Sequence, residues 1–386
     1  RLPKILIPMI RRTFPELITN EIVGVQPMSG PVGLAFALRY KYAASGLDGN
    51  AASNTGTPES VTPEGGVQGE LGHNQLDTRY TGAATSFAAG VSSMQAQSGS
   101  AAFVAQDLGY AAALSAFELD GAANMPTVEL SFEKTAVEAG TRRLGARWSV
   151  ELEQDLKNMN GIDVDAELTN AMSYEIQAEI DREMIIRMIQ ASLGGGVNKG
   201  FTTFNVASAD GRWVAERNRA FYQKLIIEAN RMAVRNRRGA ANFVVATPRV
   251  CSILEMLPEF SWMTVEGNVN TSPVGVAKVG NVGGRFNVYR DTRTEANHNL
   301  GNNSKVEYAL LGYKGPEYYD SGIIYCPYIP VMVQRTIDPD GFYPKVGLLT
   351  RYGVVDHLFG ASNYYHTVFV TGLEDSTGVG NQKSYQ

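Results

Sequence analysis

Five acidic side chains lie along one apolar-periodic segment and could, by type and spacing, bridge a metal ion. They are Glu167, Glu175, Glu179, Asp181 and Glu183. Carboxylate-bridged metal sites in helical bundles also need a Glu-x-x-His element on partner helices, and this segment contains no histidine. Arg187 follows Glu183 by four residues, which is the spacing of a helical ion pair. The pattern therefore favours a solvated helix face over a metal site.

The histidines and cysteines also lack the spacing of a reactive or metal-binding site. The histidines are His73, His298, His357 and His366. None of them pairs at i, i+4, and no HExxH or Cys-His constellation occurs. Cys251 and Cys326 are separated by a long stretch, so we expect reduced core cysteines of a protein made in a cytoplasm. Structural or solvated roles are expected for all four histidines.

Two glycine-rich segments superficially resemble nucleotide-binding loops. In GVGNQKS at 378–384, Gln382 replaces the glycine that should precede Lys383. Gly280, Gly283 and Gly284 precede a predicted strand, whereas the dinucleotide fingerprint opens a helix. No GxSxG nucleophile motif is present. We therefore expect no catalytic, cofactor-binding or metal-binding residues, and no enzyme activity.

Composition and charge narrow the class of protein further. The chain has 386 residues, 44% of them hydrophobic and 19% charged, which is enough to bury a sizeable core. Its net charge of -5 argues against a protein built to grip nucleic acid. Pro3 and Pro8 interrupt the first apolar run, so neither a signal peptide nor a membrane span is predicted. The basic cluster at 231–238 is interpreted as a solvated helix end.

The first third of the chain predicts extended structure. Prolines recur through residues 1–31, which disfavours helix and predicts an arm. Apolar residues alternate at period two in 32–42 and again in 127–134, so these two segments are predicted to pair as a ribbon. The segment between them is rich in Gly, Ala, Ser, Thr and Asn, and it must be either disordered or laid on another surface.

The remainder predicts an α+β protein. Six apolar residues form one ridge over 165–193 and predict a helix on the order of 40 Å long: Leu168, Met172, Ile176, Ile180, Met184 and Met188. Asp163 or Asp165 can cap its start, and the glycines at 194–196 stop it. A second helix is predicted over 213–237, a buried strand over 242–248, and mostly antiparallel strands from 286 onward.

Three long segments, in order, resemble the major capsid proteins of T-even-type tailed bacteriophages. They are RRTFPELITNEIVGVQPMSGPVG at 11–33, ARWSVELEQDLKNMNGIDVDAELTNAMSYEIQAEIDRE at 146–183, and GYKGPEYYDSGIIYCPYIPV at 312–331 with TRYGVV at 350–355. The resemblance implies the Hong Kong 97-type capsid fold. It further implies that a prohead protease removes a leader, which would account for a start at Arg1; trimming of the chain by other means is the open alternative. The segment 43–125 departs from the family because it shows little of the folded insertion domain of its relatives.

Domain boundaries follow from this resemblance. The expected parts are an N-terminal arm at 1–31, an extended β-ribbon loop at 32–134, a peripheral domain at 135–199 and 331–360 with a spine helix at 165–193, an axial domain at 200–330, and a C-terminal strand and flexible tail at 361–386. Arg11, Arg12 and Phe14 are the candidate intersubunit anchors of the arm, and Lys314 is a candidate intersubunit ion-pair residue.

The implied function is that of a structural subunit that self-assembles into capsomers and an icosahedral shell in the virion. Expected partners are other copies of the chain, vertex, portal and decoration proteins, scaffold and prohead protease during assembly in the host cytoplasm, and packaged double-stranded DNA bound without sequence specificity. No membrane is expected. Three alternatives stay open at this point: a related pentameric vertex protein, a non-viral nanocompartment shell protein, and a secreted β-rich carbohydrate-binding or hydrolytic protein.

Overall fold

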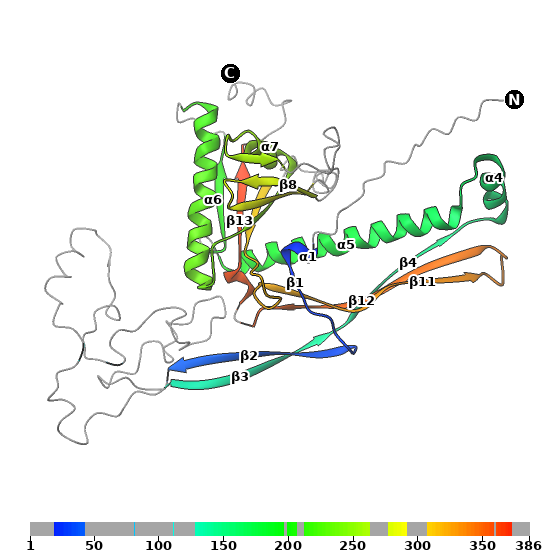
Figure 1. Cartoon of the computed structure of the whole chain (residues 1–386), viewed down its shortest axis with the longest axis horizontal. Helices are drawn as coiled ribbons and strands as arrows, with labels where there is room; N and C mark the ends of the chain where they lie inside the picture. The colour runs from blue at the N-terminus through cyan, green and yellow to red at the C-terminus, as the bar shows by residue number, and fades with distance from the viewer. Residues whose placement is uncertain are drawn as a thin grey trace.

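The computed structural model describes residues 19–42, 81, 111, 128–196, 199–206, 212–262, 277–291, 307–358 and 360–372. Its described part is elongated (Figure 1). One long helix runs through it, a narrow sheet lies along that helix, and a broader sheet with two helices packs at one end. A two-stranded ribbon extends away from the narrow sheet.

The long helix α5 covers Val164–Gly194, one residue beyond each end of the predicted segment. Its side chains at Met172, Ile176, Ile180, Met184 and Met188 are buried, which explains why the ridge was visible in the sequence. The Asp163 carboxylate accepts a hydrogen bond from the Asp165 amide at the start of the helix. At 1.5 Å per residue the helix spans about 46 Å.

A helix that the sequence did not predict, α4 at Val150–Asn160, precedes α5. Ser149 accepts a hydrogen bond from the Leu152 amide at its start, and Gly161 ends it with φ at 69° in the left-handed region that suits glycine. None of its residues is buried. Local capping and the packing of Leu156 against the core around α5 therefore set this helix.

The narrow sheet has four strands in the order β1-β11-β12-β4. Their bounds are Gly24–Val25, Ile323–Ile337, Pro344–Asp356 and Gly140–Arg147. β11 and β12 form a long antiparallel hairpin, β4 pairs antiparallel with β12, and β1 pairs parallel with β11. Val346, Leu348 and Tyr352 from this sheet share one apolar core with α5.

The broader sheet has seven strands in the order β5-β13-β10-β6-β9-β8-β7. Their bounds are Phe201–Asn205, Tyr365–Thr371, Glu307–Gly312, Phe243–Ala246, Phe286–Arg290, Ala277–Val282 and Phe260–Trp262. Alternate residues face opposite sides: Val244 and Leu311 pack with helices α6 (Val214–Asn236) and α7 (Pro248–Glu255), whereas Val245 and Leu310 pack with α5. The 3-10 helix η3 at Ala361–Asn363 leads into β13.

Two expected domain boundaries fall inside these elements. The division expected at 330/331 lies within β11, which begins at Ile323. The C-terminal strand expected in a separate segment from 361 is β13, and it lies inside the seven-stranded sheet between β5 and β10. The chain end thus contributes a central strand to the sheet of the predicted axial domain.

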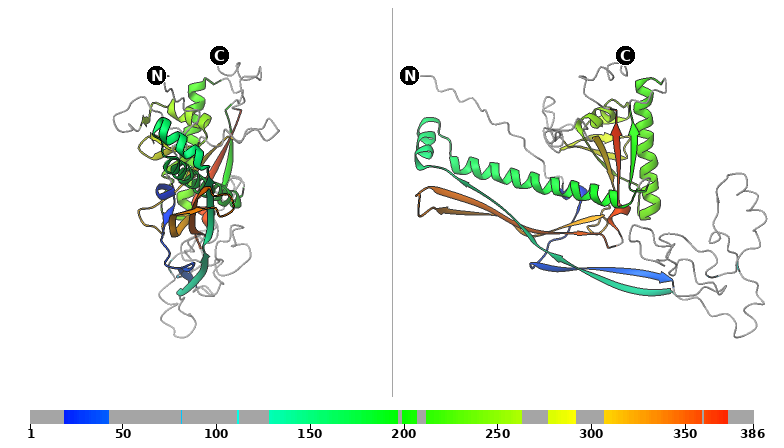
Figure 2. Two further views of the ribbon diagram at one scale, coloured as in Figure 1. Left: turned by 90° about the vertical axis from the view of Figure 1, so that its right-hand side faces the viewer. Right: turned by 180° about the vertical axis from the view of Figure 1, so that it is seen from behind.

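The ribbon pairs β2 (Val32–Tyr42) with β3 (Val128–Glu138) in antiparallel register. β3 runs four residues beyond the expected end at 134, and after Ala139 the chain continues directly into β4. Figure 2 shows β3 and β4 following one another along a single twisted path. The ribbon is therefore a continuation of the narrow sheet. The glycine-rich segment between its strands lies outside the described residues, apart from positions 81 and 111.

Candidate functional site

One face of the ribbon consists of large apolar side chains exposed to solvent. The register places Leu38 opposite Phe132 and Tyr40 opposite Leu130, and side chains opposite one another share a face. Lys134 and Glu138 lie on this apolar ribbon face too, and its large apolar members have exposed fractions between 48% and 66%: Val32, Leu34, Phe36, Leu38, Tyr40, Val128, Leu130 and Phe132. The rings of Phe36 and Phe132 stack with centroids 5.1 Å apart. A large, contiguous patch of exposed apolar side chains usually marks a surface that binds another molecule.

The base of the ribbon is held on β12 at Gly353. A Cβ at that position would lie 2.8 Å from Val137 Cγ1 and 3.0 Å from the Glu138 carbonyl oxygen. Val137 is buried there, whereas the large apolar residues farther along the ribbon are exposed. The ribbon thus has a fixed root on the narrow sheet and an open apolar face beyond it.

Residues 19–28 bind the chain's own body, and we call this segment the clasp. It contains the short helix α1 (Thr19–Ile22), in which Ile22, together with the adjacent Val23, is fully buried in the core around α5. The Asp181 carboxylate on α5, 1% exposed, accepts hydrogen bonds from the Thr19 amide at 3.3 Å and from the Thr19 hydroxyl. The interpretation of Asp181 as part of a solvated helix face was therefore wrong.

The clasp also contacts both sheets. Tyr289 of β9 donates a 2.7 Å hydrogen bond to the Glu21 carboxylate, and Lys314 Nζ donates to the Asn20 carbonyl oxygen at 2.5 Å. Burial lowers the pKa of Lys314, against an opposing effect of the nearby Glu21. The strand β1 pairs with β11, and its Gly24 leaves no room for a Cβ, which would lie 2.0 Å from the Tyr318 carbonyl oxygen. The clasp therefore joins α5 and both sheets.

Of the four contact residues predicted from the sequence, the structure describes one. Arg11, Arg12 and Phe14 lie outside the described residues. Lys314 contacts Asn20 of its own chain, and its expected intersubunit ion pair stays a prediction. The part of the expected arm from Thr19 onward packs on the body of the same chain, because its apolar and polar groups find partners there.

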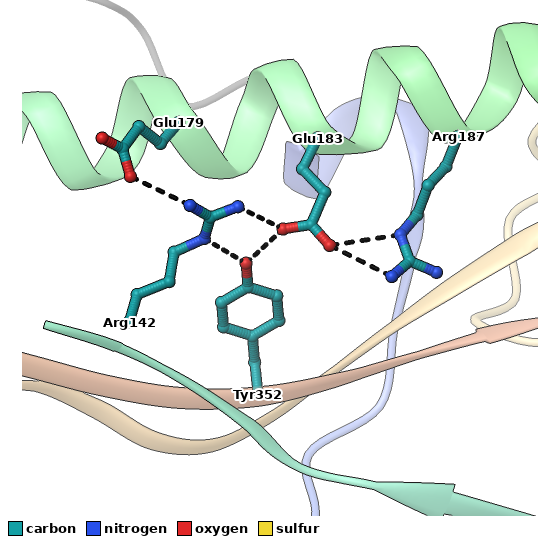
Figure 3. Close-up of polar contacts among 5 residues, drawn as sticks. All are labelled: Arg142, Glu179, Glu183, Arg187 and Tyr352. Atoms are coloured by element: carbon teal, nitrogen blue, oxygen red, sulfur yellow. Dashed lines mark hydrogen bonds and ion pairs between the residues drawn. The ribbon is translucent and has the colours of Figure 1, made fainter.

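A charged network fastens the narrow sheet to α5 (Figure 3). Arg142 of β4 contacts Glu179 at 2.9 Å, Glu183 at 2.6 Å and the Tyr352 hydroxyl at 2.5 Å. The expected pair between Arg187 and Glu183 is present at 3.1 Å. Burial would raise the pKa of Glu183, but hydrogen bonds from Tyr352 and Arg142 outweigh it and lower that pKa. The pKa of Tyr352 rises to about 12, mainly through burial.

A buried contact joins α5 to the broader sheet as well. Asp291, at the end of β9, is fully buried and pairs with Arg182 of α5. Tyr308 of β10 donates a 2.5 Å hydrogen bond to the same carboxylate. Burial and the adjacent Asp291 raise the pKa of Tyr308 well above its ordinary value. This buried carboxylate thus fastens α5 to the broader sheet.

Inside the broader sheet, His366 and Glu228 form a second buried polar cluster. Glu228 on α6 accepts from Lys224 and Arg231, each at 2.9 Å, and lies 3.5 Å from His366 Nε2. Thr202 Oγ1 lies 3.2 Å from the same ring nitrogen. Burial lowers the pKa of His366 to about 4, so the ring is neutral near pH 7. This arrangement agrees with the structural role expected for His366.

The described residues also bear on the predicted basic helix end, on metal binding and on membrane spans. The C-terminal end of α6 lies at Asn236, and Arg238 pairs there with Asp320 at 3.5 Å. Within the described ranges, no three His, Cys, Asp or Glu side chains are grouped to hold a metal ion. None of the helices in that part of the chain is long and apolar enough to cross a membrane. The clasp contacts of Asp181 were missed because the partner lies 162 residues away.

Comparison with known proteins identifies the family. The family described as "Major capsid protein Gp23" matches residues 1–379. The major capsid protein of Vibrio phage KVP40 is 31% identical over 95% of this chain and 82% of its own length. The major capsid protein of Serratia phage KSP90 is 32% identical over 97% of this chain and 82% of its own length.

A solved structure supports the fold independently. The capsid of Myoviridae phage XM1 aligns with a TM-score of 0.50 and 11% identity, covering 96% of this chain and 97% of that one. At that identity the likeness bears on the fold alone, and it agrees with the Hong Kong 97-type capsid fold expected from the sequence. The extent of the family match and the identity to these relatives lead to one conclusion: the chain belongs to the Gp23 family of major capsid proteins.

Proposed function

We propose that copies of this major capsid protein build the head shell of a tailed bacteriophage by docking the apolar ribbon face onto a neighbouring copy. The observation that carries the proposal is that face itself, with eight large apolar side chains left about half exposed in a chain that otherwise buries a full core. Soluble monomers rarely keep such a continuous surface uncovered. A subunit of a shell covers it on assembly.

The energetics favour many moderate contacts. Burying the rest of each half-exposed Leu or Phe contributes about 1 kcal/mol, half of the value for full burial. Eight such residues give several kcal/mol before the cost of association is subtracted. The contact is heterologous, because the ribbon face meets a different surface on its neighbour, and heterologous contacts that close by rotation generate rings. Each subunit then both gives and receives a ribbon.

The rest of the assembly scheme belongs to the same proposal. Residues 1–18, with Arg11, Arg12 and Phe14, reach a neighbouring copy, and a leader is cleaved by a prohead protease before the shell matures. Vertex, portal, decoration and scaffold proteins are the further partners, and assembly takes place in the host cytoplasm, where buried Cys251 and Cys326 stay reduced. The net charge of -5 suits a shell that encloses DNA without gripping it. No step of this scheme requires enzyme activity from the chain.

The ribbon proposal is tested with a double substitution, Phe36→Asp with Phe132→Asp. Two charges in the middle of the apolar face should abolish capsomers and shells in electron microscopy and sedimentation, because desolvating an unpaired carboxylate costs several kcal/mol. The matched control is Thr135→Asp with Ala35→Asp, since these two residues are paired on the opposite ribbon face. Shells formed by the Phe variant would contradict the proposal, as would equal loss in the control.

A further inference from the structure

We infer that the outward face of α6 docks an acidic amphipathic helix of a partner protein. The face has an apolar ridge, a row of cations beside that ridge, and no described element covering it. It shares no residue with the apolar ribbon face, so the contact is additional to the one proposed for shell assembly.

α6 has apolar side chains on two sides. One side packs against the broader sheet, with Phe221 and Leu225 fully buried in the core there. On the other side Trp213, at the N-terminal cap, and Ile227 and Val234 are 78%, 40% and 70% exposed. A surface helix ordinarily has polar residues opposite its buried side. α6 therefore keeps a second apolar side that is exposed to solvent.

The exposed apolar residues of α6 lie on one line. Positions 213, 220, 227 and 234 are seven apart, and residues seven apart lie nearly above one another on a helix. We call this line the α6 ridge: Trp213, Ala220, Ile227 and Val234. At 1.5 Å per residue it extends about 32 Å. Figures 1 and 2 show α6 at the outside of the broader sheet, with no other described helix or strand beyond it. A helix of similar length can therefore lie along the ridge.

A row of cations accompanies the α6 ridge. Arg217, Lys224 and Arg231 are also seven apart, each four residues after a member of the ridge. Lys224 and Arg231 share one carboxylate, that of the buried Glu228, at 2.9 Å each. Residues 212–238 contain eight basic and two acidic residues, although the net charge of the whole chain is -5. The surface beside the ridge is therefore positively charged.

The ridge and the cation row together select the chemistry of the partner. A helix with apolar residues at every third or fourth position covers a ridge of this spacing, and carboxylates along one side of that helix meet the cations. Duplex DNA would bind the cations through its phosphates but would leave the ridge exposed. A second α6 in antiparallel orientation would place one cation row beside the other, which repels. An acidic amphipathic helix satisfies both features.

A synthetic peptide tests the docking surface. The probe has about 21 residues, with Leu at the two apolar positions of each heptad and Glu beside them. It should bind the unassembled full chain, and raising the salt from about 0.05 M to about 0.5 M should weaken binding about tenfold. A matched peptide with Lys in place of every Glu should not bind. Failure of the acidic peptide to bind, or equal binding of both peptides, would overturn the inference.

Tryptophan fluorescence locates the bound peptide. Trp213 is 78% exposed, so its emission should shift to shorter wavelength when the peptide covers it. The chain also contains Trp148 and Trp262, and a Trp213→Phe variant should still bind the peptide but lose the shift. Binding without a change in Trp213 emission would place the peptide away from the ridge and overturn the inference.

Substitutions of exposed residues test the ridge without disturbing the core. Ile227→Ser with Val234→Ser should weaken binding of the acidic peptide about tenfold, because each removes part of the burial of one apolar side chain. Gln223→Ser, at an exposed position of the same helix outside the ridge, is the matched control and should leave the affinity unchanged. Equal affinities of the serine double variant and the original chain would overturn the inference.

The cation row has its own variant. Arg231→Gln removes one charge and leaves Lys224 paired with Glu228, so the helix keeps its buried ion pair. The acidic peptide should bind this variant about threefold more weakly, and the salt dependence of binding should decrease. Unchanged affinity and unchanged salt dependence would exclude the cation row from the contact and overturn the inference.

Three measurements separate this contact from other occupants of the ridge. Duplex DNA that binds more tightly than the acidic peptide would assign the surface to nucleic acid. A dimer of the unassembled chain that the Ile227→Ser and Val234→Ser variant loses in sedimentation would assign it to a second copy. Either result would overturn the inference. The variant with Phe36→Asp and Phe132→Asp should bind the peptide as the original chain does, so failure of the ribbon proposal leaves this contact standing.

Discussion

The clasp and the ribbon follow each other directly in the sequence, yet the clasp side chains are buried in their own chain whereas the ribbon side chains are exposed to solvent. In the clasp, Ile22 and Val23 are fully buried, and Thr19 hydrogen-bonds to a buried carboxylate of the same chain. In the ribbon, Leu34 and its apolar neighbours are about half exposed. The comparison teaches that burial, and not hydrophobicity, separates the residues that fold one subunit from those that we propose to join two. Substitutions in the clasp should unfold the monomer, and those in the ribbon should spare it.

Ile22→Ala should have the largest effect on the isolated chain. Truncating a fully buried Ile costs about 2–5 kcal/mol through lost transfer free energy and the cavity left behind. The free energy of unfolding, measured by denaturant titration of unassembled protein, should fall by that amount. The matched control is Val32→Ala at the start of the ribbon, where the exposed side chain predicts a change within about 0.5 kcal/mol. Equal losses in the two variants would break the comparison between clasp and ribbon.

Asp181→Ala should come next. The substitution leaves the Thr19 amide and hydroxyl in a buried position without their acceptor, which costs about 1–3 kcal/mol. Hydrogen exchange of the Thr19–Ile22 amides should accelerate more than that of the β2 amides. Glu175→Ala, an exposed carboxylate on the same helix, is the control and should change neither. Unchanged exchange in the Asp181 variant would mean that the other contacts of the clasp hold it without this carboxylate.

His366 predicts a smaller effect that depends on pH. Its pKa is lowered to about 4 in the folded chain from an ordinary value of 6.5, so the unfolded chain takes up a proton first as the pH falls. Stability is therefore full above pH 6.5 and is lost between pH 6.5 and 4. Glu228, Lys224, Arg231, Arg235 and Thr202 surround the ring, and Glu228 opposes the shift. The loss should be about 3 kcal/mol.

Replacing the ring tests this origin. In His366→Gln the dependence of the unfolding free energy on pH between 6.5 and 4 should be weaker than in the original chain. His357→Gln, at a partly exposed histidine, should leave it as it was. An unchanged pH dependence in the His366 variant would assign the acid sensitivity in this range to groups other than His366.

Local patterns predicted most of the elements, whereas contacts between distant segments escaped them. The bounds of α5 were predicted within one residue because its ridge and caps are local. The ribbon was predicted because its strands alternate. The place of β13 between β5 and β10 was not, since nothing in Tyr365–Thr371 specifies which strands it pairs with. Asp181 was misassigned because the spacing of the five acidic residues along the helix does not tell which of them is buried.

Leu34→Ala should have the smallest effect on the monomer. It therefore separates an effect on assembly from an effect on folding most clearly. Leu34 is paired with Ala136 on the open ribbon face, so truncation removes little burial and should change the unfolding free energy by less than about 0.5 kcal/mol. If the ribbon face is covered on assembly, the same truncation removes burial in every contact of the shell. The protein concentration needed for assembly should then rise by about threefold to tenfold, corresponding to about 1 kcal/mol per contact. The comparison would fail if the concentration needed for assembly changed with the free energy of unfolding of the monomer and not with the exposure of the ribbon residues. One set of residues would then serve both folding and assembly.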